Sequence, residues 1–372
     1  MAEIRVDNLV KQFGGFTAVR NANFTVENGD FFCLLGPSGC GKTTTLRMIA
    51  GLELPTSGRI LLDGEDVTFR RARERDIAMV FQLFALYPHM NVRRNISFPL
   101  VSMGVPREET RKRVEDAARI LRIEHLLNKS VSGLSGGDRQ RVALGRAIVR
   151  EPKAFMMDEP LGALDAEFRH LMCGELRALH DRLKATTVYV THDQLEAMSM
   201  ADKIAVMNEG EIEQLGAPQD IYDFPASMFV GDFIGSPAMN FIHFESGLAT
   251  GDTSVTIDGA TIAVPALRET RNPGPLALGV RPEQIIISDR LGAPDAIPGE
   301  VFGAEYLGTN QIITLITPRG SIKARAPAHA RAIAGDRVSV AFRAERLSLF
   351  DAATGKAIDS ARDAHATGTR HG

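Results

Sequence analysis

The sequence predicts an α/β domain with a parallel sheet and a helical insert, followed by a smaller all-β domain. At 372 residues the chain is longer than one ordinary hydrophobic core accommodates. Its first half alternates short apolar segments with helical patterns, which is typical of a parallel sheet covered by helices. After about Ser236 the chain is rich in strand patterns separated by Gly and Pro. We therefore expect domains over residues 1–235 and 236–358, with a frayed polar tail over 359–372.

Five apolar segments of the first domain are predicted to form its parallel sheet. Each is short, free of charge and bounded by polar turns, as expected of strands buried on both faces. The segments are Phe31 to Leu35, Ile77 to Phe81, Ala154 to Met157, Thr187 to Val190 and Ile204 to Met207. Residues from about 88 to 153 form the expected helical insert, with helices over Arg107 to Leu121 and after Gly137.

In the second domain, short strands and tight turns predict a small barrel or sandwich. Thr256 to Ile262 has the pattern of a hairpin, because its central Asp-Gly dipeptide accommodates positive φ. A strand over Ile312 to Ile316, a turn over Pro318 to Gly320 and a strand over Val338 to Phe342 continue the pattern.

Composition and charge narrow the class of protein. Hydrophobic residues make up 44% of the chain, and the net charge of −3 provides no overall field that would favour nucleic acid as a partner. The three cysteines, Cys33, Cys40 and Cys173, lack disulfide or metal-ligand spacing and are expected to be reduced thiols. The N-terminus lacks a signal-peptide pattern and the apolar runs are short, so the chain is not expected to cross a membrane by itself.

A phosphate-binding loop follows the first predicted strand. The segment matches the pattern G-x-x-x-x-G-K-[ST] and opens a helix. Its residues are Gly36, Pro37, Ser38, Gly39, Cys40, Gly41, Lys42 and Thr43, with Thr44 continuing into the helix. Glycines let backbone N–H groups face a polyphosphate, Lys42 supplies a point charge to its β and γ phosphates, and the Thr43 hydroxyl suits Mg²⁺. A Gly-rich turn matching by chance is the alternative, which the flanking strand and helix disfavour.

Acidic and polar residues end three more strands at the same expected sheet edge. Asp158 follows the Ala154 strand and is expected to hold Mg²⁺ through water, and Glu159 beside it suits a general base that polarises the attacking water. His192 is placed to contact both a γ-phosphate and Glu159. Gln82 is placed to reach Mg²⁺ or the water. Each of these signals is weak alone and gains meaning from the phosphate-binding loop.

A second anion-binding pattern occurs at Ser135-Gly136-Gly137-Asp138, where a hydroxyl and free N–H groups open a helix. A plain helix cap is the alternative. One nucleotide needs only one phosphate-binding loop, so a second such feature requires a separate reason.

Together these motifs resemble those of ATP-binding cassette (ABC) ATPases, and the resemblance supplies that reason. It implies a head-to-tail dimer, in which the signature Ser135 to Gly137 of one subunit covers the Mg²⁺-ATP held by the other. It further implies that Gln82 is the Q-loop residue, that Asp165 belongs to the D-loop and that His192 is the switch histidine. Phe13 lies where the family places an aromatic ring against adenine; packing under the edge strand is the alternative.

Further segments resemble the carbohydrate-importer subfamily, which includes maltose and glycerol-phosphate ATPases. These are Pro88 to Val92, Thr191 to Met198, Phe233 to Asn240, Gly279 to Glu283 and Glu305 to Gly308. The subfamily implies an OB-like (TOBE-type) regulatory domain at the C-terminal end. It also implies a bacterial importer of a sugar, sugar derivative, polyol or glycerol phosphate.

The subfamily also implies partners and a location. These are a second ATPase subunit, identical or similar, two transmembrane permease subunits and, indirectly, a solute-binding protein, at the cytoplasmic face of the inner membrane. An importer of polyamine, sulfate or iron is the nearest alternative. A non-transport ABC ATPase of DNA repair or translation conflicts with the TOBE-like end, and a monomeric P-loop kinase would have no use for Ser135 to Gly137.

Two residues, Asp138 and Gly162, depart from the pattern of the ABC family, and two further features bear on thiol chemistry and on docking. Asp138 stands where glutamine is usual; it suits the helix dipole and a ribose hydroxyl, but it brings negative charge near a polyphosphate. Gly162 replaces a common serine in the D-loop. A partly exposed Cys40 at a helix N-terminus is expected to have a lowered pKa. Leu83 to His89 is either buried in the helical insert or, as the family implies, docks a permease helix.

Overall fold

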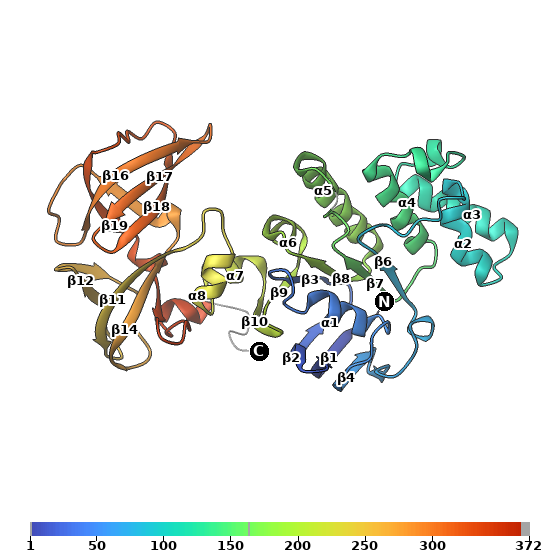
Figure 1. Ribbon diagram of the computed structural model, residues 1–372, viewed down its shortest axis with the longest axis horizontal. Helices are drawn as coiled ribbons and strands as arrows, with labels where there is room; N and C mark the ends of the chain where they lie inside the picture. The colour runs from blue at the N-terminus through green and yellow to red at the C-terminus, as the bar shows by residue number, and fades with distance from the viewer. Residues whose placement is uncertain (1, 163, 366–372) are drawn as a thin grey trace. The chain divides into compact units, whose positions relative to one another are not determined.

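The computed structural model describes residues 2–162 and 164–365, which form two compact units that divide between Pro218 and Gln219. The predicted α/β unit with a helical insert and the all-β second unit are both confirmed (Figure 1). The strands of the first unit are β1 (Ile4–Phe13), β2 (Phe16–Val26), β3 (Phe31–Leu35), β4 (Ser57–Leu62), β5 (Glu65–Asp66), β6 (Ile77–Val80), β7 (Ala154–Asp158), β8 (Thr186–Thr191), β9 (Lys203–Asn208) and β10 (Glu211–Gly216). Its helices are α1 (Lys42–Ile49), α2 (Val92–Ser102), α3 (Arg107–Ile120), α4 (Gly136–Ile148), α5 (Ala166–Leu183) and α6 (Gln194–Met200), while α7 (Pro218–Asp223) begins at the division.

The parallel sheet has the strand order β10-β9-β3-β8-β7-β6, in which only the edge strand β10 is antiparallel to its neighbour. All five predicted strands are present, although β6 ends one residue early, at Val80. The strands β3, β7 and β8 are buried at every position, which explains why β3 is apolar throughout and why the polar residues of β7 and β8 lie near their ends. Because these strands are parallel, their carboxyl ends bring the segments that follow them to one edge of the sheet.

A second, antiparallel sheet of order β2-β1-β4-β5 was not predicted from the sequence. In β1 only one face is buried, so charged residues interrupt its apolar pattern. The buried face joins a single hydrophobic core with α1 and the parallel sheet, represented by Ile4, Leu46 and Val190. The helix α1, which follows the phosphate-binding loop, is therefore held by both sheets.

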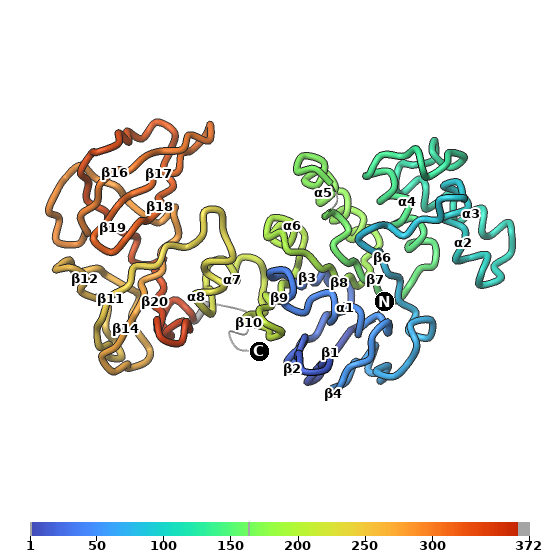
Figure 2. Tube along the Cα trace, viewed as in Figure 1, coloured from blue at the N-terminus to red at the C-terminus, as the bar shows by residue number. Residues whose placement is uncertain are grey.

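The helical insert consists of α2, α3 and α4, which pack on one another between β6 and β7 in the chain (Figure 2). Asn91 caps α2 by accepting a hydrogen bond from the Arg94 amide at 2.9 Å. The buried Asn95 side chain accepts from the Tyr87 amide at 2.8 Å and donates to the Tyr87 carbonyl at 3.1 Å. These bonds fix the loop by which the chain enters the insert. No helix that the structure describes is both long and apolar enough to span a bilayer.

The second unit is built from antiparallel strands around its own core. One sheet has the order β15-β19-β16-β17-β18, a second the order β11-β14-β20, and β12 pairs with β13. Their bounds, with those of the remaining helix, are α8 (Met228–Phe233), β11 (Asn240–Leu248), β12 (Ser254–Ile257), β13 (Ala260–Ala263), β14 (Arg271–Val280), β15 (Ile285–Ser288), β16 (Ile297–Tyr306), β17 (Asn310–Thr317), β18 (Gly320–Pro327), β19 (Arg337–Phe342) and β20 (Ser348–Asp351). The Asp-Gly hairpin is confirmed: Asp258 and Gly259 have φ of 50° and 84°.

The division between the units lies earlier than the change of sequence character near Ser236, and Arg281 gives the physical reason. Its buried guanidinium donates to three backbone carbonyls before β11, those of Tyr222, Gly231 and Ile234. Burial lowers the pKa of Arg281 to about 10, which leaves it charged near neutral pH. The segment from residue 219 onward is thereby tied to the second unit.

Of the tail expected over residues 359–372, the structure describes residues 359–365. The amide of Asp359 donates to Glu269 at 2.9 Å, and the Ser360 hydroxyl donates to Asp363 at 2.9 Å. The remaining residues of the predicted tail lie outside the described part of the chain.

Candidate active site

The phosphate-binding loop connects β3 to α1 and depends on glycine where other backbone comes close. Gly41 has φ of 104°, and a Cβ there would lie 2.4 Å from the Ala18 carbonyl oxygen. A Cβ on Gly36 would lie 2.2 Å from the Met207 carbonyl oxygen. No other residue fits either position without moving the backbone. The loop is thus shaped by strands on both of its sides.

Lys42 lies inside this loop and is only 4% exposed. Its ammonium group donates to the carbonyl oxygens of Gly36 and Pro37, each at 2.8 Å. The charge and the first amides of α1 are therefore concentrated at one place, which favours a bound polyphosphate. Ser38 and Gly39, at the tip of the loop, are exposed, while Thr44 is half-buried in the first turn of α1.

Thr43 and Asp158 meet at the end of β7. The Thr43 hydroxyl donates to Oδ1 of Asp158 at 2.8 Å, and Asp158 is 8% exposed. Burial raises the pKa of Asp158, and the bond from Thr43 opposes the rise. Hydroxyl and carboxylate oxygens are the ligands that Mg²⁺ prefers, and that ion usually takes few protein ligands beside phosphate oxygens. The residues present therefore fit a Mg²⁺ ion bound together with a nucleotide.

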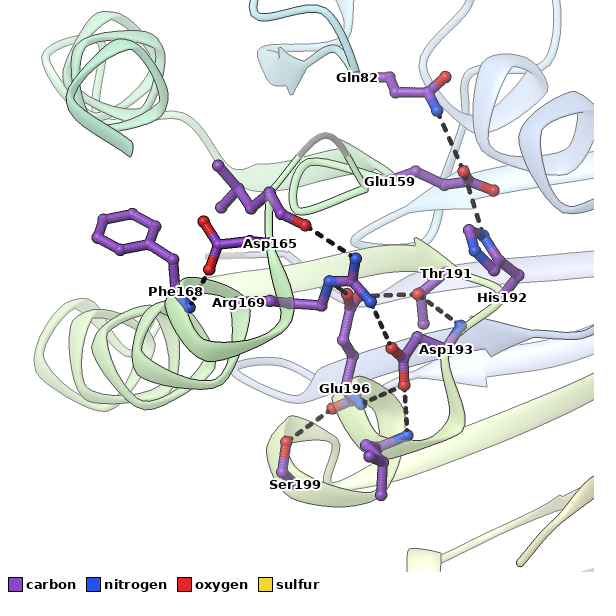
Figure 3. A network of polar contacts seen from close by, with 12 residues as sticks. Gln82, Glu159, Asp165, Phe168, Arg169, Thr191, His192, Asp193, Glu196 and Ser199 are labelled. Atoms are coloured by element: carbon purple, nitrogen blue, oxygen red, sulfur yellow. Dashed lines mark hydrogen bonds and ion pairs between the residues drawn. The ribbon is translucent and has the colours of Figure 1, made fainter. Parts of the chain in front are cut away.

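The loops that follow β6 and β8 bring Gln82 and His192 to the carboxylate of Glu159, which follows β7 (Figure 3). Gln82 donates from Nε2 to Oε2 of Glu159 at 3.3 Å, and Nδ1 of His192 lies 3.4 Å from the same oxygen. Glu159 itself has φ of 43°, and its amide donates to the Val190 carbonyl at 3.0 Å. A non-glycine residue at such a φ is uncommon and is held by its surroundings. The sequence-predicted residues Gln82, Glu159 and His192 are therefore brought together at the sheet edge.

The signature Ser135 to Asp138 lies at the start of α4, on the helical insert. Oγ of Ser135 accepts from the Asp138 amide at 3.2 Å and donates to Oδ2 of Asp138 at 2.8 Å. Arg141 lies 3.6 Å from Asp138 and bonds to Glu175 of α5 at 3.0 Å. The ring of Phe168 covers Gly137, where a Cβ would meet it at 2.0 Å. The hydroxyl and carboxylate of the signature are thus engaged with each other within this chain.

Phe13 and Asp165 occupy defined places. Phe13 ends β1 opposite Phe16, is 49% exposed, and carries the Lys11 ammonium 4.6 Å from its ring centroid. So much exposure disfavours the alternative that the ring only packs under the edge strand. Asp165 caps α5 by accepting from the Phe168 amide at 2.9 Å. In the same segment Gly162 donates to the Glu159 carbonyl at 3.2 Å, while Ala163 lies outside the described residues.

The expected partial exposure and lowered pKa of Cys40 are wrong. The side chain is 3% exposed, and burial raises the pKa of its thiol despite the Lys42 ammonium 3.6 Å from Sγ. Desolvation of a thiolate at this position therefore outweighs the positive end of α1. Cys33 and Cys173 are likewise buried free thiols whose pKa values are raised by burial.

Two arginines that position the site, the buried Arg75 and the partly buried Arg169, were not identified from the sequence. Arg75 is 2% exposed and caps α1 by donating to the Met48 and Ile49 carbonyls at 2.7 and 2.8 Å. Its charge complements the negative end of the helix, and burial lowers its pKa to about 10. Arg169 of α5 contacts the segments of Asp165 and His192. No local pattern marks either residue, because Arg75 bonds to backbone carbonyls and Arg169 pairs with carboxylates of a distant segment.

Comparisons with known proteins agree with this geometry. Residues 19–162 match the family model for the ABC transporter, residues 235–285 the MalK OB fold domain and residues 278–350 the TOBE domain. The chain is 46% identical to the trehalose/maltose import ATP-binding protein MalK of Thermococcus litoralis, covering 96% of this chain and 100% of that protein. It is 42% identical to an sn-glycerol-3-phosphate import ATP-binding protein UgpC of Agrobacterium fabrum, with 97% and 95% covered. A solved dimeric bacterial ABC transporter cassette superposes with a TM-score of 0.52 at 32% identity, covering 58% of this chain and 98% of that one.

Proposed function

The chain belongs to the ABC transporter ATPase family, and we propose that it energises a bacterial importer of a sugar, sugar derivative, polyol or glycerol phosphate by hydrolysing ATP. The observation that carries the proposal is the Glu159 carboxylate, which Gln82 and His192 both contact beside the phosphate-binding loop. The MalK OB fold and TOBE matches of the second unit, and the importer names of the relatives, support the substrate class.

The proposed hydrolysis uses positioning and charge. Lys42 binds the β and γ phosphates. Thr43 with Asp158 would hold Mg²⁺, which when bound would neutralise charge that develops on the phosphates. Gln82 would contact the same ion or the attacking water. Glu159 accepts the proton of that water, and His192 orients both the carboxylate and the γ-phosphate. Phe13 stacks on the adenine.

A second subunit, identical or similar, completes each site in this proposal. Cassettes of this family act as dimers in importers, and the solved relative is described as dimeric. The signature amides and the Ser135 hydroxyl face the phosphates held by the partner, and Asp165 lies at the same contact. ATP binding draws the subunits together, and hydrolysis lets them part.

Asp138 is expected to weaken the contact between the signature and the nucleotide of the partner subunit. Because the Ser135 hydroxyl donates to Asp138, its hydrogen is not directed at a phosphate, and the carboxylate would repel one. Asp138→Gln is expected to raise kcat/KM for ATP by up to about tenfold, mainly through KM, at a stability cost of about 0.3–1 kcal/mol from the lost helix-dipole interaction. Steady-state kinetics and thermal unfolding check both effects. Asp138→Asn keeps the side-chain length as a control for shape. An unchanged or raised KM in both variants would contradict the expectation that the Asp138 carboxylate weakens nucleotide binding.

A groove that is apolar over most of its lining, and that also includes Arg73, Glu74, Asp76 and Arg150, supports docking of a permease. A cavity of about 740 Å³ opens between the α/β part of the first unit and the helical insert, lined by Leu52, Met79, Tyr87, Phe98, Met103 and Arg146 among others. Arg146 of α4 also donates to the carbonyls of Phe84 and Ala85, so the segment after Gln82 is tied to the signature helix. Leu83 is 82% exposed. A cytoplasmic helix of a transmembrane permease would fill this groove and hold the chain at the cytoplasmic face of the membrane.

Met103→Glu is expected to weaken permease association by about tenfold or more, because it places a charge in a groove that must be desolvated on docking. The basal ATPase activity of the isolated subunits is expected to stay unchanged. Co-purification with the permease and solute-stimulated ATPase activity are the measurements. Val101→Glu, two residues earlier in the chain but outside the groove lining, is the matched control, since Val101 and Met103 are 64% and 62% exposed. Equal association of both variants would exclude the groove as the docking site.

The importer assignment is tested by reconstituting the chain with its permease and solute-binding protein in vesicles. Sugars, sugar derivatives, polyols and glycerol phosphate are added separately, and ATP hydrolysis is measured. Stimulation by a member of this group supports the proposal. Stimulation only by a polyamine, sulfate or iron would replace it with the neighbouring class of importer, and co-purification with nucleic acid instead of a permease would refute transport altogether.

A further inference from the structure

Arg169 lies in the first turns of α5 and contacts two loops that come from different places in the chain (Figure 3). Its Nη2 donates to the Leu164 carbonyl at 3.0 Å, immediately before Asp165. Its Nη1 donates to Oδ2 of Asp193 at 2.9 Å, immediately after His192. The planar guanidinium therefore spans from the Asp165 loop to the His192 loop with two bonds of fixed geometry.

The loop of His192 is itself rigidly held on the far side of this contact. The second oxygen of Asp193 accepts from the Leu195 amide at 2.8 Å and so caps α6, while the Asp193 amide donates to Thr191 at 2.9 Å. Thr191 in turn donates to Glu196 at 2.8 Å. A shift of Asp193 is thus transmitted to Thr191, on the other side of His192.

Glu196 supplies the counter-charge that keeps Arg169 in place. This carboxylate is 3% exposed, accepts from the Tyr189 hydroxyl at 2.8 Å and lies 3.6 Å from Nε of Arg169. Burial raises the pKa of Glu196, and the bonds from Thr191 and Tyr189 oppose the rise. A buried carboxylate needs such partners to stay ionised. If Arg169 only supplied the charge opposite Glu196, its role would be structural.

Together with contacts of Glu159, these bonds nevertheless form a closed path through the candidate active site. Gly162, two residues before Leu164, donates to the Glu159 carbonyl, and Glu159 faces His192 at 3.4 Å. The Asp165 loop is therefore connected to the hydrolytic pair on one side through the backbone and on the other side through Arg169. A displacement of the Asp165 loop relative to the His192 loop would therefore strain the two bonds of Arg169.

We propose that Arg169 is a positioning residue that couples the Asp165 loop to His192, so that closure of the dimer at Asp165 aligns His192 with Glu159 for hydrolysis. The inference rests on the proposed function, because it assumes that a second subunit contacts the Asp165 loop. Arg169 does not touch the nucleotide in this scheme. It acts only through Asp193 and Leu164, so its loss should affect turnover and leave nucleotide binding alone.

The test uses the full chain with three variants. Arg169→Met removes the contacts, and Arg169→Lys keeps the charge opposite Glu196 but loses the two-loop fork. Arg177→Met is the matched control: Arg177 lies on the same helix with a similar side-chain exposure of 31% against 27%, and it likewise donates to a backbone carbonyl and a carboxylate, those of Met200 and Asp202. Steady-state ATP hydrolysis and thermal unfolding are measured at a protein concentration that supports dimers.

For Arg169→Met we expect kcat to fall by about 10- to 100-fold with KM for ATP changed by less than about twofold. Arg169→Lys is expected to unfold near the wild-type temperature. Its kcat should nevertheless be lower than that of the wild type by about fivefold or more. Arg177→Met should lose stability with a kcat within about twofold of wild type.

Wild-type kcat in Arg169→Lys would show that the charge alone matters and would overturn the proposal. Equal kcat losses in Arg169→Met and Arg177→Met would do the same, and Arg169→Lys still decides the matter if Arg169→Met does not fold. Failure of the proposed function is a separate result, since the wild-type chain would then hydrolyse no ATP.

Discussion

Glu159→Gln is expected to retain ATP binding and to lower kcat by about 10²- to 10⁴-fold, the range that a general base contributes. The amide is nearly the same size as the carboxylate, so the contacts of Gln82 and His192 can be kept, but it accepts no proton from the attacking water. Because ATP binding closes the proposed dimer and hydrolysis opens it, the variant should also accumulate as an ATP-bound dimer. Steady-state hydrolysis, nucleotide affinity and size-exclusion chromatography with ATP measure these effects.

Glu167→Gln provides the matched control, since Glu167 is an exposed glutamate eight residues further along the chain. It should hydrolyse ATP at the wild-type rate. If Glu159→Gln retained wild-type turnover, Glu159 would not be the base. If the variant lost nucleotide binding as well, its carboxylate would have a structural role instead.

Ser135→Arg is expected to abolish hydrolysis while the isolated subunit still binds ATP. A bulky cation at the start of α4 blocks the approach of the signature to the partner's nucleotide, and loss of a hydroxyl that stabilises the transition state costs about 10²- to 10³-fold in comparable sites. The phosphate-binding loop of the same chain is untouched. Lys42→Ala should behave differently, losing nucleotide affinity together with hydrolysis, because Lys42 lies inside that loop.

The control for Ser135→Arg is Ser132→Arg, three residues earlier and exposed to solvent. It adds the same side chain beside the signature without displacing the Ser135 hydroxyl. Comparable inhibition by both variants would mean that added charge, and not the signature contact, causes the loss. Loss of ATP affinity in monomeric Ser135→Arg would place Ser135 on the nucleotide of its own subunit.

The sequence predicted those parts of the structure that depend on local patterns. The strands buried on both faces, the loop from Gly36 to Thr43 and the Asp-Gly turn at Asp258 all carry signals within a few residues, and each is present. The antiparallel sheet of β1, β2, β4 and β5 was missed because its strands are buried on one face only and contain charged residues.

Features that depend on tertiary contacts could not be predicted in the same way. The Sγ of Cys40 lies against Gly36, and the side chain belongs to the hydrophobic core that both sheets share, which no local pattern reports. Arg281 bonds to carbonyls of distant segments, and Arg169 pairs with the carboxylates of Asp193 and Glu196 more than 20 residues away, so nothing near them in the sequence marks their role. The pairing of Asp138 with Ser135 has a local cause, and the helix-cap pattern Ser-x-x-Asp was the signal that could have found it.

In the proposed dimer, one nucleotide is held by Lys42 of one subunit and covered by Ser135 of the other. A crystal structure of the Glu159→Gln chain grown with Mg²⁺ and ATP measures this directly. Oγ of Ser135 is expected at hydrogen-bond distance, about 3 Å, from the γ-phosphate of an ATP whose phosphates contact the partner subunit's Lys42. A Ser135 exposed to solvent and distant from every triphosphate in that crystal would contradict it.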